Sequence, residues 1–101
     1  MRRAAKTDRN QIDIVAAFRS AGANVQPLHQ VGGGVPDLLV GIGGKLMLVE
    51  VKDGKRPPSD RTLTPEQERW HAAWEGYPVY VITDVSEVYR FAENSPALMM
   101  V

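Results

Sequence analysis

The stretch from Gly32 to Lys52, GGGVPDLLVGIGGKLMLVEVK, constrains the fold of this chain more than any other. Two apolar runs rich in Val, Leu and Ile flank the pair Gly43-Gly44, and a glycine pair between such runs is typical of a β-hairpin. A two-residue loop here fixes the register, because each step back along the first strand matches one step forward along the second. Asp37 is then expected directly opposite Glu50, on the same face of the sheet.

A pair of carboxylates at this position has a chemical use. Directly opposed residues have Cβ atoms roughly 4.5–5.5 Å apart, and side-chain alternation puts Lys52 on the face of Asp37 and Glu50. Two carboxylates held this close resist joint ionisation unless a cation lies between them. Mg²⁺ or Mn²⁺ would suit these oxygen ligands. The alternative is structural: Asp37 begins a strand near a turn, while Glu50 and Lys52 form a surface pair at a strand end.

Several strings in the sequence resemble one group of nucleases. Pro36-Asp37, followed by Glu50-Val51-Lys52 after a hydrophobic hairpin, resembles the metal site of the PD-(D/E)xK nuclease superfamily. The strings GGGVPDLLV, LVEVKDG and LTPEQERW resemble its small VRR-NUC members, including phage-borne stand-alone domains. The resemblance extends over most of the chain, from residue 10 to residue 84.

The resemblance implies both a fold and an activity. The fold is α/β with a restriction-endonuclease-like core: a mixed central sheet whose β-hairpin carries the site, flanked by helices in the order αβββαβα. Asp37, Glu50 and the backbone carbonyl of Val51 would bind the divalent metal, and Lys52 would position or activate water for phosphodiester hydrolysis. The implied substrate is DNA, with branched or junction DNA as a candidate structure.

Helices and strands are expected around the hairpin in an order that fits this fold. Both faces of the hairpin are apolar, which predicts helices on both sides of the sheet. Thr64, Pro65 and Gln67 form a strong helix start, with Thr as the N-cap and Gln three residues after it. The expected elements are a helix over 8–21, an edge strand over 24–28, a helix over 65–75, a buried strand over 77–83 and a helix over 85–92.

Polar residues on the two longer helices are further site candidates. Gln11 falls on the apolar stripe of the first helix, and Asp8 and Asn10 lie near its edges. VRR-NUC proteins often carry an acidic metal-site residue on this helix, so the resemblance makes Asp8 or Asn10 a candidate, with helix capping as the alternative. Related nucleases also place a glutamine near the site at the head of the later helix. Gln67 is therefore a candidate catalytic or supporting residue as well as half of a capping box.

Composition limits the class of protein. At 101 residues with 44% hydrophobic and 24% charged residues, the chain is expected to be one domain over 1–101, with residues 1–7 as a basic arm. It has no cysteine, so disulfides and thiolate zinc sites are excluded. No apolar run is long enough to span a membrane, and no signal peptide is expected. The lack of cysteine suits a reducing cytosol, and the resemblance to phage-borne VRR-NUC domains implies the cytoplasm of a bacterium or of a phage-infected host cell.

Charge is distributed unevenly although the formal net charge is zero. Residues 1–63 carry ten Lys and Arg against six Asp and Glu, whereas residues 64–101 carry two against six. Such polarity lets one face meet phosphates. The candidate DNA contacts are Arg2, Arg3, Lys55, Arg56 and Arg61, with solvated segments as the alternative. The apolar end LMMV is expected to pack on the core or on a second subunit, and a homodimer would allow two cuts.

Three functions follow from these patterns. The leading hypothesis is a Mg²⁺-dependent endonuclease acting on DNA. The second is a non-catalytic nucleic-acid-binding or assembly module that keeps the nuclease fold, which the intact set of Asp37, Glu50 and Lys52 argues against. The third is a phosphate-ligand protein that uses Gly32-Gly33-Gly34, although this run lacks the lysine and Ser/Thr of a P-loop.

Overall fold

The computed structural model describes residues 9–93, and its elements follow the expected order αβββαβα. Asp8, Arg2, Arg3 and the LMMV segment, all named above as candidates, lie outside the described residues. The elements are α1 (Arg9–Ser20), β1 (Asn24–Pro27), β2 (Leu38–Ile42), β3 (Lys45–Val51), the short 3-10 helix η1 (Pro58–Asp60), α2 (Pro65–Ala73), β4 (Val79–Ile82) and α3 (Val85–Glu93).

The β2–β3 hairpin has the register that its two-glycine loop predicts. Ile42 pairs with Lys45 on either side of the loop, and Leu38 pairs with Val49 at the other end. Gly43 and Gly44 have φ angles of 58° and 83°, the positive values that favour glycine in a two-residue hairpin loop. One further step along this register sets residue 37 opposite residue 50. Local turn chemistry therefore fixes the geometry of the expected site.

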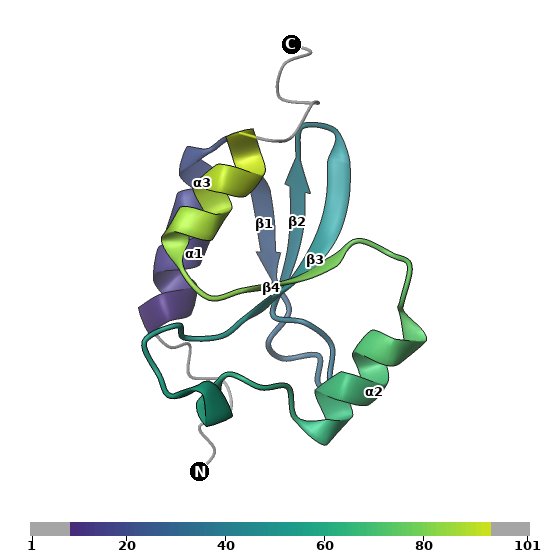
Figure 1. Cartoon of the computed structure of the whole chain (residues 1–101). Coiled ribbons are helices and arrows are strands. Elements are labelled where there is room, and N and C mark those ends of the chain that lie inside the picture. The colour runs from purple at the N-terminus through teal and green to yellow at the C-terminus, as the bar shows by residue number, and fades with distance from the viewer. Residues whose placement is uncertain (1–8, 94–101) are drawn as a thin grey trace.

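The hairpin is the centre of a four-stranded mixed sheet in the order β1-β2-β3-β4 (Figure 1). β1 runs antiparallel to β2, and β4 runs parallel to β3 after a crossover through α2. A parallel neighbour needs such a crossover, because a short turn can only reverse the chain. The predicted fold class, a mixed sheet with flanking helices, is confirmed.

The hydrophobic core lies between one face of the sheet and the helices α1 and α3, which pack side by side (Figure 1). Ile14 and Phe18, one turn apart on α1, are fully buried against Leu38, Val40 and Val49 of the hairpin. Fully burying one side chain of this kind contributes about 1.5–3 kcal/mol. This packing fixes α1 against the hairpin that carries the site.

Two expectations about burial are wrong. The second face of the hairpin has no helix over its tip, where Leu46 is 65% exposed. α2 lies beside the opposite end of the sheet instead (Figure 1). β4 is not a buried strand either: Tyr80 and Val81 are each 42% exposed, and Ile82 is its buried residue. β4 forms an edge of the sheet, so its apolar composition does not make it a central strand.

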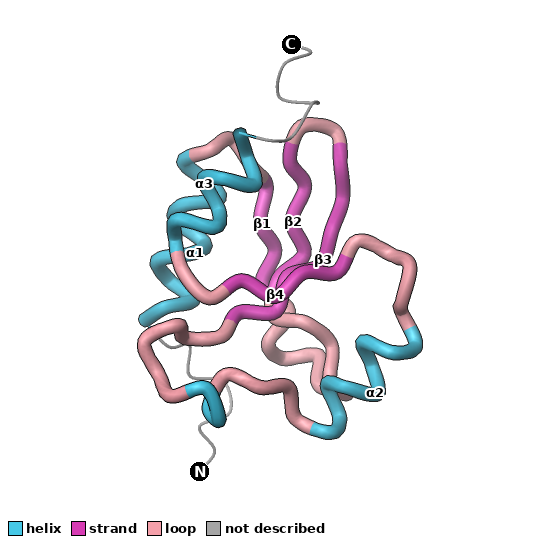
Figure 2. The backbone as a smooth tube through the Cα atoms, in the orientation of Figure 1, coloured by secondary structure: helices cyan, strands magenta, loops and turns pink. Residues whose placement is uncertain are grey.

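Loops gather at one end of the sheet, where β2 begins and β3 ends (Figure 2). The start of α2 lies at this end as well, which brings residues from distant parts of the chain together. Within residues 9–93, no helix combines the length and apolar character needed to cross a membrane.

Candidate active site

A pocket of about 650 Å³ opens at the loop-rich end of the sheet. Its walls come from α1, the loop before β2, the end of β3, the segment after β3 and the start of α2. The sequence candidates in its lining are Gln11, Asp37, Glu50, Val51, Lys52, Arg56 and Gln67. The hairpin and α2 thus bring Gln67 to the carboxylates of Asp37 and Glu50.

Asp37 and Glu50 form the acidic centre of this pocket. The Oδ2 atom of Asp37 accepts a hydrogen bond of 2.8 Å from the backbone N–H of Val51, which fixes the carboxylate against β3. Glu50 is only 2% exposed, and no described residue donates a hydrogen bond to its buried Oε1 atom; a hydrogen bond between the Glu50 and Asp37 side chains requires one of the two carboxyl groups to be protonated. An unpaired buried carboxylate oxygen is costly, so this atom marks a position for a ligand.

The burial of Glu50 and its closeness to Asp37 also change its protonation. The pKa of Glu50 is raised from its ordinary value of 4.5 to about 8, first by burial and then by the charge of Asp37 and a hydrogen bond with the Asp37 side chain. Lys52 and the hydrogen bond from Gln67 act in the opposite direction, toward a lower pKa. Without a cation, Glu50 therefore holds its proton at neutral pH. A bound cation would favour the ionised form.

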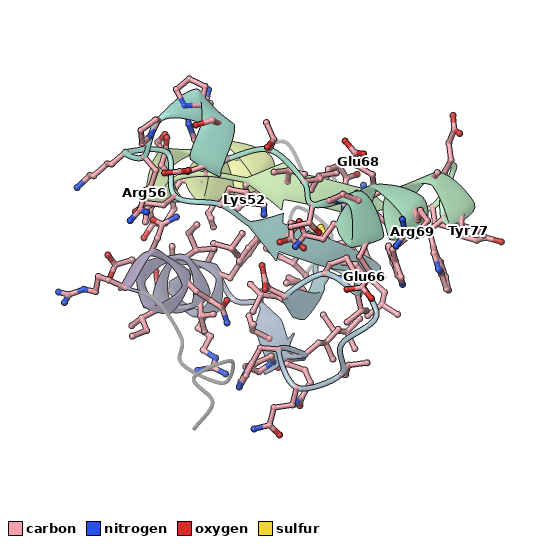
Figure 3. The ribbon with its side chains drawn as sticks, turned by 90° about the horizontal axis from the view of Figure 1, so that it is seen from below. Lys52, Arg56, Glu66, Glu68, Arg69 and Tyr77 are labelled. Atoms are coloured by element: carbon pink, nitrogen blue, oxygen red, sulfur yellow. The ribbon has the colours of Figure 1, made fainter. Side chains whose placement is uncertain are left out.

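Lys52 is held beside Glu50 by Gln67. The Nζ atom of Lys52 donates a 3.0 Å hydrogen bond to Oε1 of Gln67, and Nε2 of Gln67 donates one of 2.9 Å to Oε2 of Glu50. Lys52 Nζ lies 3.8 Å from the same Glu50 oxygen. Figure 3 views this end of the molecule and shows Lys52 between α1 and the start of α2. The amide of Gln67 thus orients both charged groups.

The same glutamine closes the start of α2. Thr64 Oγ1 accepts from the backbone N–H of Gln67 at 3.2 Å, and Gln67 Oε1 accepts from the backbone N–H of Thr64 at 2.9 Å. This is the predicted capping box. Gln67 is therefore both a helix-capping residue and part of the site, since its Oε1 atom accepts hydrogen bonds from Thr64 and from Lys52.

Comparison with known proteins identifies the family. No family model and no curated protein matches the chain. Among solved structures, a VRR_NUC domain is similar with a TM-score of 0.62 and 31% sequence identity, over 85% of this chain and 92% of that one. The chain belongs to the VRR-NUC family. The fold that its sequence strings resemble is thereby confirmed, and this VRR-NUC domain has a nuclease-type fold.

The residues of this VRR-NUC domain fit a divalent metal ion with oxygen ligands. Among residues 9–93 there is no group of three or more His, Cys, Asp and Glu placed to hold a metal, so side chains offer two carboxylates, Asp37 and Glu50. A backbone carbonyl can be the third ligand. In a strand, the N–H and C=O of one residue point to the same side, and the N–H of Val51 points to Asp37. Two carboxylates, a carbonyl and waters suit Mg²⁺.

Asn10 has a different position from the one expected of a metal ligand. Its Nδ2 atom donates to the backbone carbonyl of Lys52 at 2.7 Å and to that of Thr83 at 3.2 Å, and Asn10 does not line the pocket. It therefore ties α1 to the ends of β3 and β4. The neighbouring residue, Gln11, does line the pocket and is 8% exposed. The predicted metal role of Asn10 is wrong for this geometry.

The basic candidates do not share one environment. Arg56 lines the pocket, and its Nε atom lies 3.5 Å from Oδ2 of Asp60. Lys55 is exposed outside the pocket lining. Arg61 is partly buried, and its Nε atom is enclosed with no partner among the described residues. The DNA contact by Arg61 stays a prediction, and it would come from the terminal guanidinium nitrogens, since the Nε atom is enclosed.

His71 lies one turn after Gln67 on α2 but does not line the pocket. Its pKa is lowered from 6.5, first by burial and then by the charge of Lys52. Sequence reasoning missed Glu66 as a pocket residue and treated Thr64 only as a helix cap, although both line the pocket. The available signal was their position beside Gln67 in the first turn of α2.

Proposed function

We propose that this VRR-NUC domain is a divalent-metal-dependent endonuclease that hydrolyses phosphodiester bonds in DNA. One observation carries the proposal: Asp37 and Glu50 face one pocket, and the buried Oε1 atom of Glu50 lacks a partner beside the ammonium group of Lys52. This arrangement combines a site for a hard cation with a positive charge for a phosphate. A binding module with no reaction to perform has no evident use for such a costly group.

Asp37, Glu50 and the carbonyl of Val51 would hold Mg²⁺ or Mn²⁺. When bound, such an ion supplies polarisation of a phosphate oxygen and a lowered pKa for coordinated water. Asp37 contributes orientation, because its second oxygen is already fixed by the N–H of Val51. Glu50 loses its proton on binding the cation, since the cation offsets the burial and the repulsion that raise its pKa.

Lys52 would meet the reacting phosphate. Its ammonium group is held by Gln67 at 3.0 Å, so it is oriented before the substrate arrives. A fixed positive charge stabilises the negative charge that develops on the phosphoryl oxygens during attack by water. Gln67 acts as a positioning residue, because its contacts in this structure are to Glu50, Lys52 and Thr64.

The DNA backbone would lie across the pocket, close to Arg56. Contacts from Arg56 and Lys55 to phosphates would hold the strand without reading its sequence. Specificity for branched or junction DNA is the finer part of the proposal, and it rests on the family resemblance. A panel of linear, flapped, single-stranded and four-way-junction DNAs with Mg²⁺ tests it, and equal cleavage of all four would contradict it.

Asp37→Ala tests the activity itself. The variant should lose Mg²⁺-dependent cleavage at least 100-fold while its DNA affinity in EDTA stays within about threefold of the wild type. Asp13→Ala is a matched control, since Asp13 is an exposed acid whose ion pair with Arg9 is remote from the pocket. If the wild type binds DNA but cleaves none of the panel with Mg²⁺ or Mn²⁺, the protein is a binding module and the proposal fails.

A homodimer is the second part of the proposal. The sheet face opposite α1 and α3 leaves Leu46 exposed at the hairpin tip, and Tyr77 and Val81 are 64% and 42% exposed. Exposed apolar side chains of this kind can take part in association. β4 also offers an open edge that could pair with its own copy across a two-fold axis. Light scattering should give a mass of twice the chain mass for the wild type and of one chain for the Val81→Lys variant. A wild-type mass of one chain at the assay concentration would refute the homodimer.

A further inference from the structure

The loop before β2 contains three successive glycines that share an unusual conformation. Gly32, Gly33 and Gly34 have φ angles of 79°, 70° and 83°, in the region that other residues rarely adopt. All three line the pocket that contains Asp37 and Glu50. Across residues 9–93, none of their backbone N–H groups donates a hydrogen bond to another described residue. Three neighbouring donors at one wall of the pocket therefore remain available.

Gly32 and Gly33 are exposed and Gly34 is partly buried, so a ligand that enters the pocket can reach their backbone N–H groups. Successive N–H groups in a turn can form a concave anion site. The space beside the loop is open: a Cβ built on Gly32 or Gly33 would meet no atom within 4 Å. Gly34 is different, because its Cβ would lie 2.5 Å from the carbonyl oxygen of Glu66. Gly34 thus packs the loop against α2, and the two preceding glycines face free space.

The charges in the pocket make such donors useful. Its charged lining is mainly acidic, with Lys52 and Arg56 set against five carboxyl groups, those of Asp37, Glu50, Asp53, Asp60 and Glu66. A phosphate that enters this pocket meets repulsion from most directions. Neutral N–H donors can hold phosphate oxygens without adding a charged side chain. The buried Oε1 atom of Glu50, to which no described residue donates a hydrogen bond, independently marks the same pocket as a ligand site.

We propose that the loop Gly32–Gly34 is a phosphate-binding site, in which backbone N–H groups bind a non-bridging oxygen of one phosphate of the DNA strand. The inference rests on the proposed function, and it names the part of the substrate that this wall holds. The loop contributes binding and register, because it brings a phosphate to the carboxylates of Asp37 and Glu50. It takes no part in the chemical step.

Glycine-selective nitrogen-15 labelling provides a direct test. The chain has nine glycines, so its amide spectrum is simple and Gly22, Gly41, Gly44 and Gly76 serve as internal controls. The Asp37→Asn variant in EDTA prevents cleavage while a short DNA duplex is added. We expect the amide proton signals of Gly32 to Gly34 to move downfield when DNA is added, while the chemical shifts of the control glycines remain unchanged. If the loop signals stay while the DNA binds, the inference is wrong.

Substitution provides a second test with a matched control. Gly33→Ala and Gly22→Ala impose the same kind of backbone strain, because both glycines have positive φ and neither has an atom within 4 Å of its Cβ position. Only Gly33 lines the pocket with Glu50. We expect Gly33→Ala to weaken DNA binding about 10-fold and Gly22→Ala to leave it unchanged. Equal weakening by both variants, at equal folded fraction, refutes the inference.

A modified substrate separates this inference from the proposed function. Each phosphate of the DNA is replaced in turn by an uncharged methylphosphonate. At one position, this replacement should weaken the binding of the DNA to the wild type but not its binding to the Gly33→Ala variant. The absence of any such position refutes the loop site even if the wild type cleaves DNA. If that position exists and no cleavage occurs with any divalent ion, the loop site stands and the proposed nuclease activity fails.

Discussion

The stability of the metal-free protein should depend on the protonation of Glu50. The pKa of Glu50 is raised to about 8 in the folded, metal-free protein from an ordinary value of 4.5. A raised pKa means that the folded state holds the proton more tightly than the unfolded state does. The resulting stability is fully present below about pH 4.5 and is lost as the pH rises through about 8. Glu50→Gln removes this titration while keeping the shape of the side chain.

The size of the effect follows from these two pKa values. One pKa unit corresponds to about 1.36 kcal/mol, so the interval from 4.5 to about 8 corresponds to a loss of about 5 kcal/mol across the whole range. Between pH 5 and pH 8 the expected loss is about 3–4 kcal/mol. Because small domains have unfolding free energies of about 5–15 kcal/mol, a loss of this size should be readily visible.

Urea unfolding in EDTA at several pH values measures the difference. We expect the free energy of unfolding of the wild type, relative to Glu50→Gln, to fall by that amount from pH 5 to pH 8. Taking the difference cancels titrating groups that do not interact with residue 50, including His71, whose lowered pKa acts in the opposite sense at acidic pH. Saturating Mg²⁺ should abolish the wild-type loss. Parallel curves for the two proteins in EDTA would refute the view that Glu50 holds a buried proton.

Two further substitutions test the contacts around the site. Asn10→Ala removes the hydrogen bonds to the backbone carbonyls of Lys52 and Thr83, and it should lower the free energy of unfolding in urea by about 1–3 kcal/mol. It should also lower kcat while the Mg²⁺ concentration for half-maximal cleavage stays the same. A change in that Mg²⁺ concentration would instead indicate that Asn10 is a metal ligand. Thr64→Ala removes the hydroxyl that accepts from the backbone N–H of Gln67 but keeps the backbone N–H that donates to the Gln67 side chain. It should cost about 1 kcal/mol of stability and reduce kcat by loosening the first turn of α2, which positions Gln67. An unchanged kcat would show that the remaining contacts hold Gln67 in place.

Much of this site could be predicted from the sequence because it depends on local rules. Gly43 and Gly44 allow a two-residue loop, and the two-residue period of a strand then leaves one register that buries the apolar face. That register sets Asp37 opposite Glu50. The capping box between Thr64 and Gln67 is equally local, since its two residues are three apart on one helix turn.

The wrong predictions concern groups whose surroundings come from distant segments. Asn10 was expected near a metal, but its partners are 42 and 73 residues away in sequence. The composition of β4 is that of a buried strand, yet its place at the sheet edge leaves it half exposed.

The sequence by itself determined the hairpin, its register and the opposition of two carboxylates, because each follows from turn chemistry and alternation within about twenty residues. Only the tertiary structure decided that Gln67 bridges Lys52 and Glu50, and that the loop Gly32–Gly34 forms a wall of the same pocket. The physical reason is that neither contact is set by local chain geometry. Both depend on where the crossover through α2 packs against the end of the sheet.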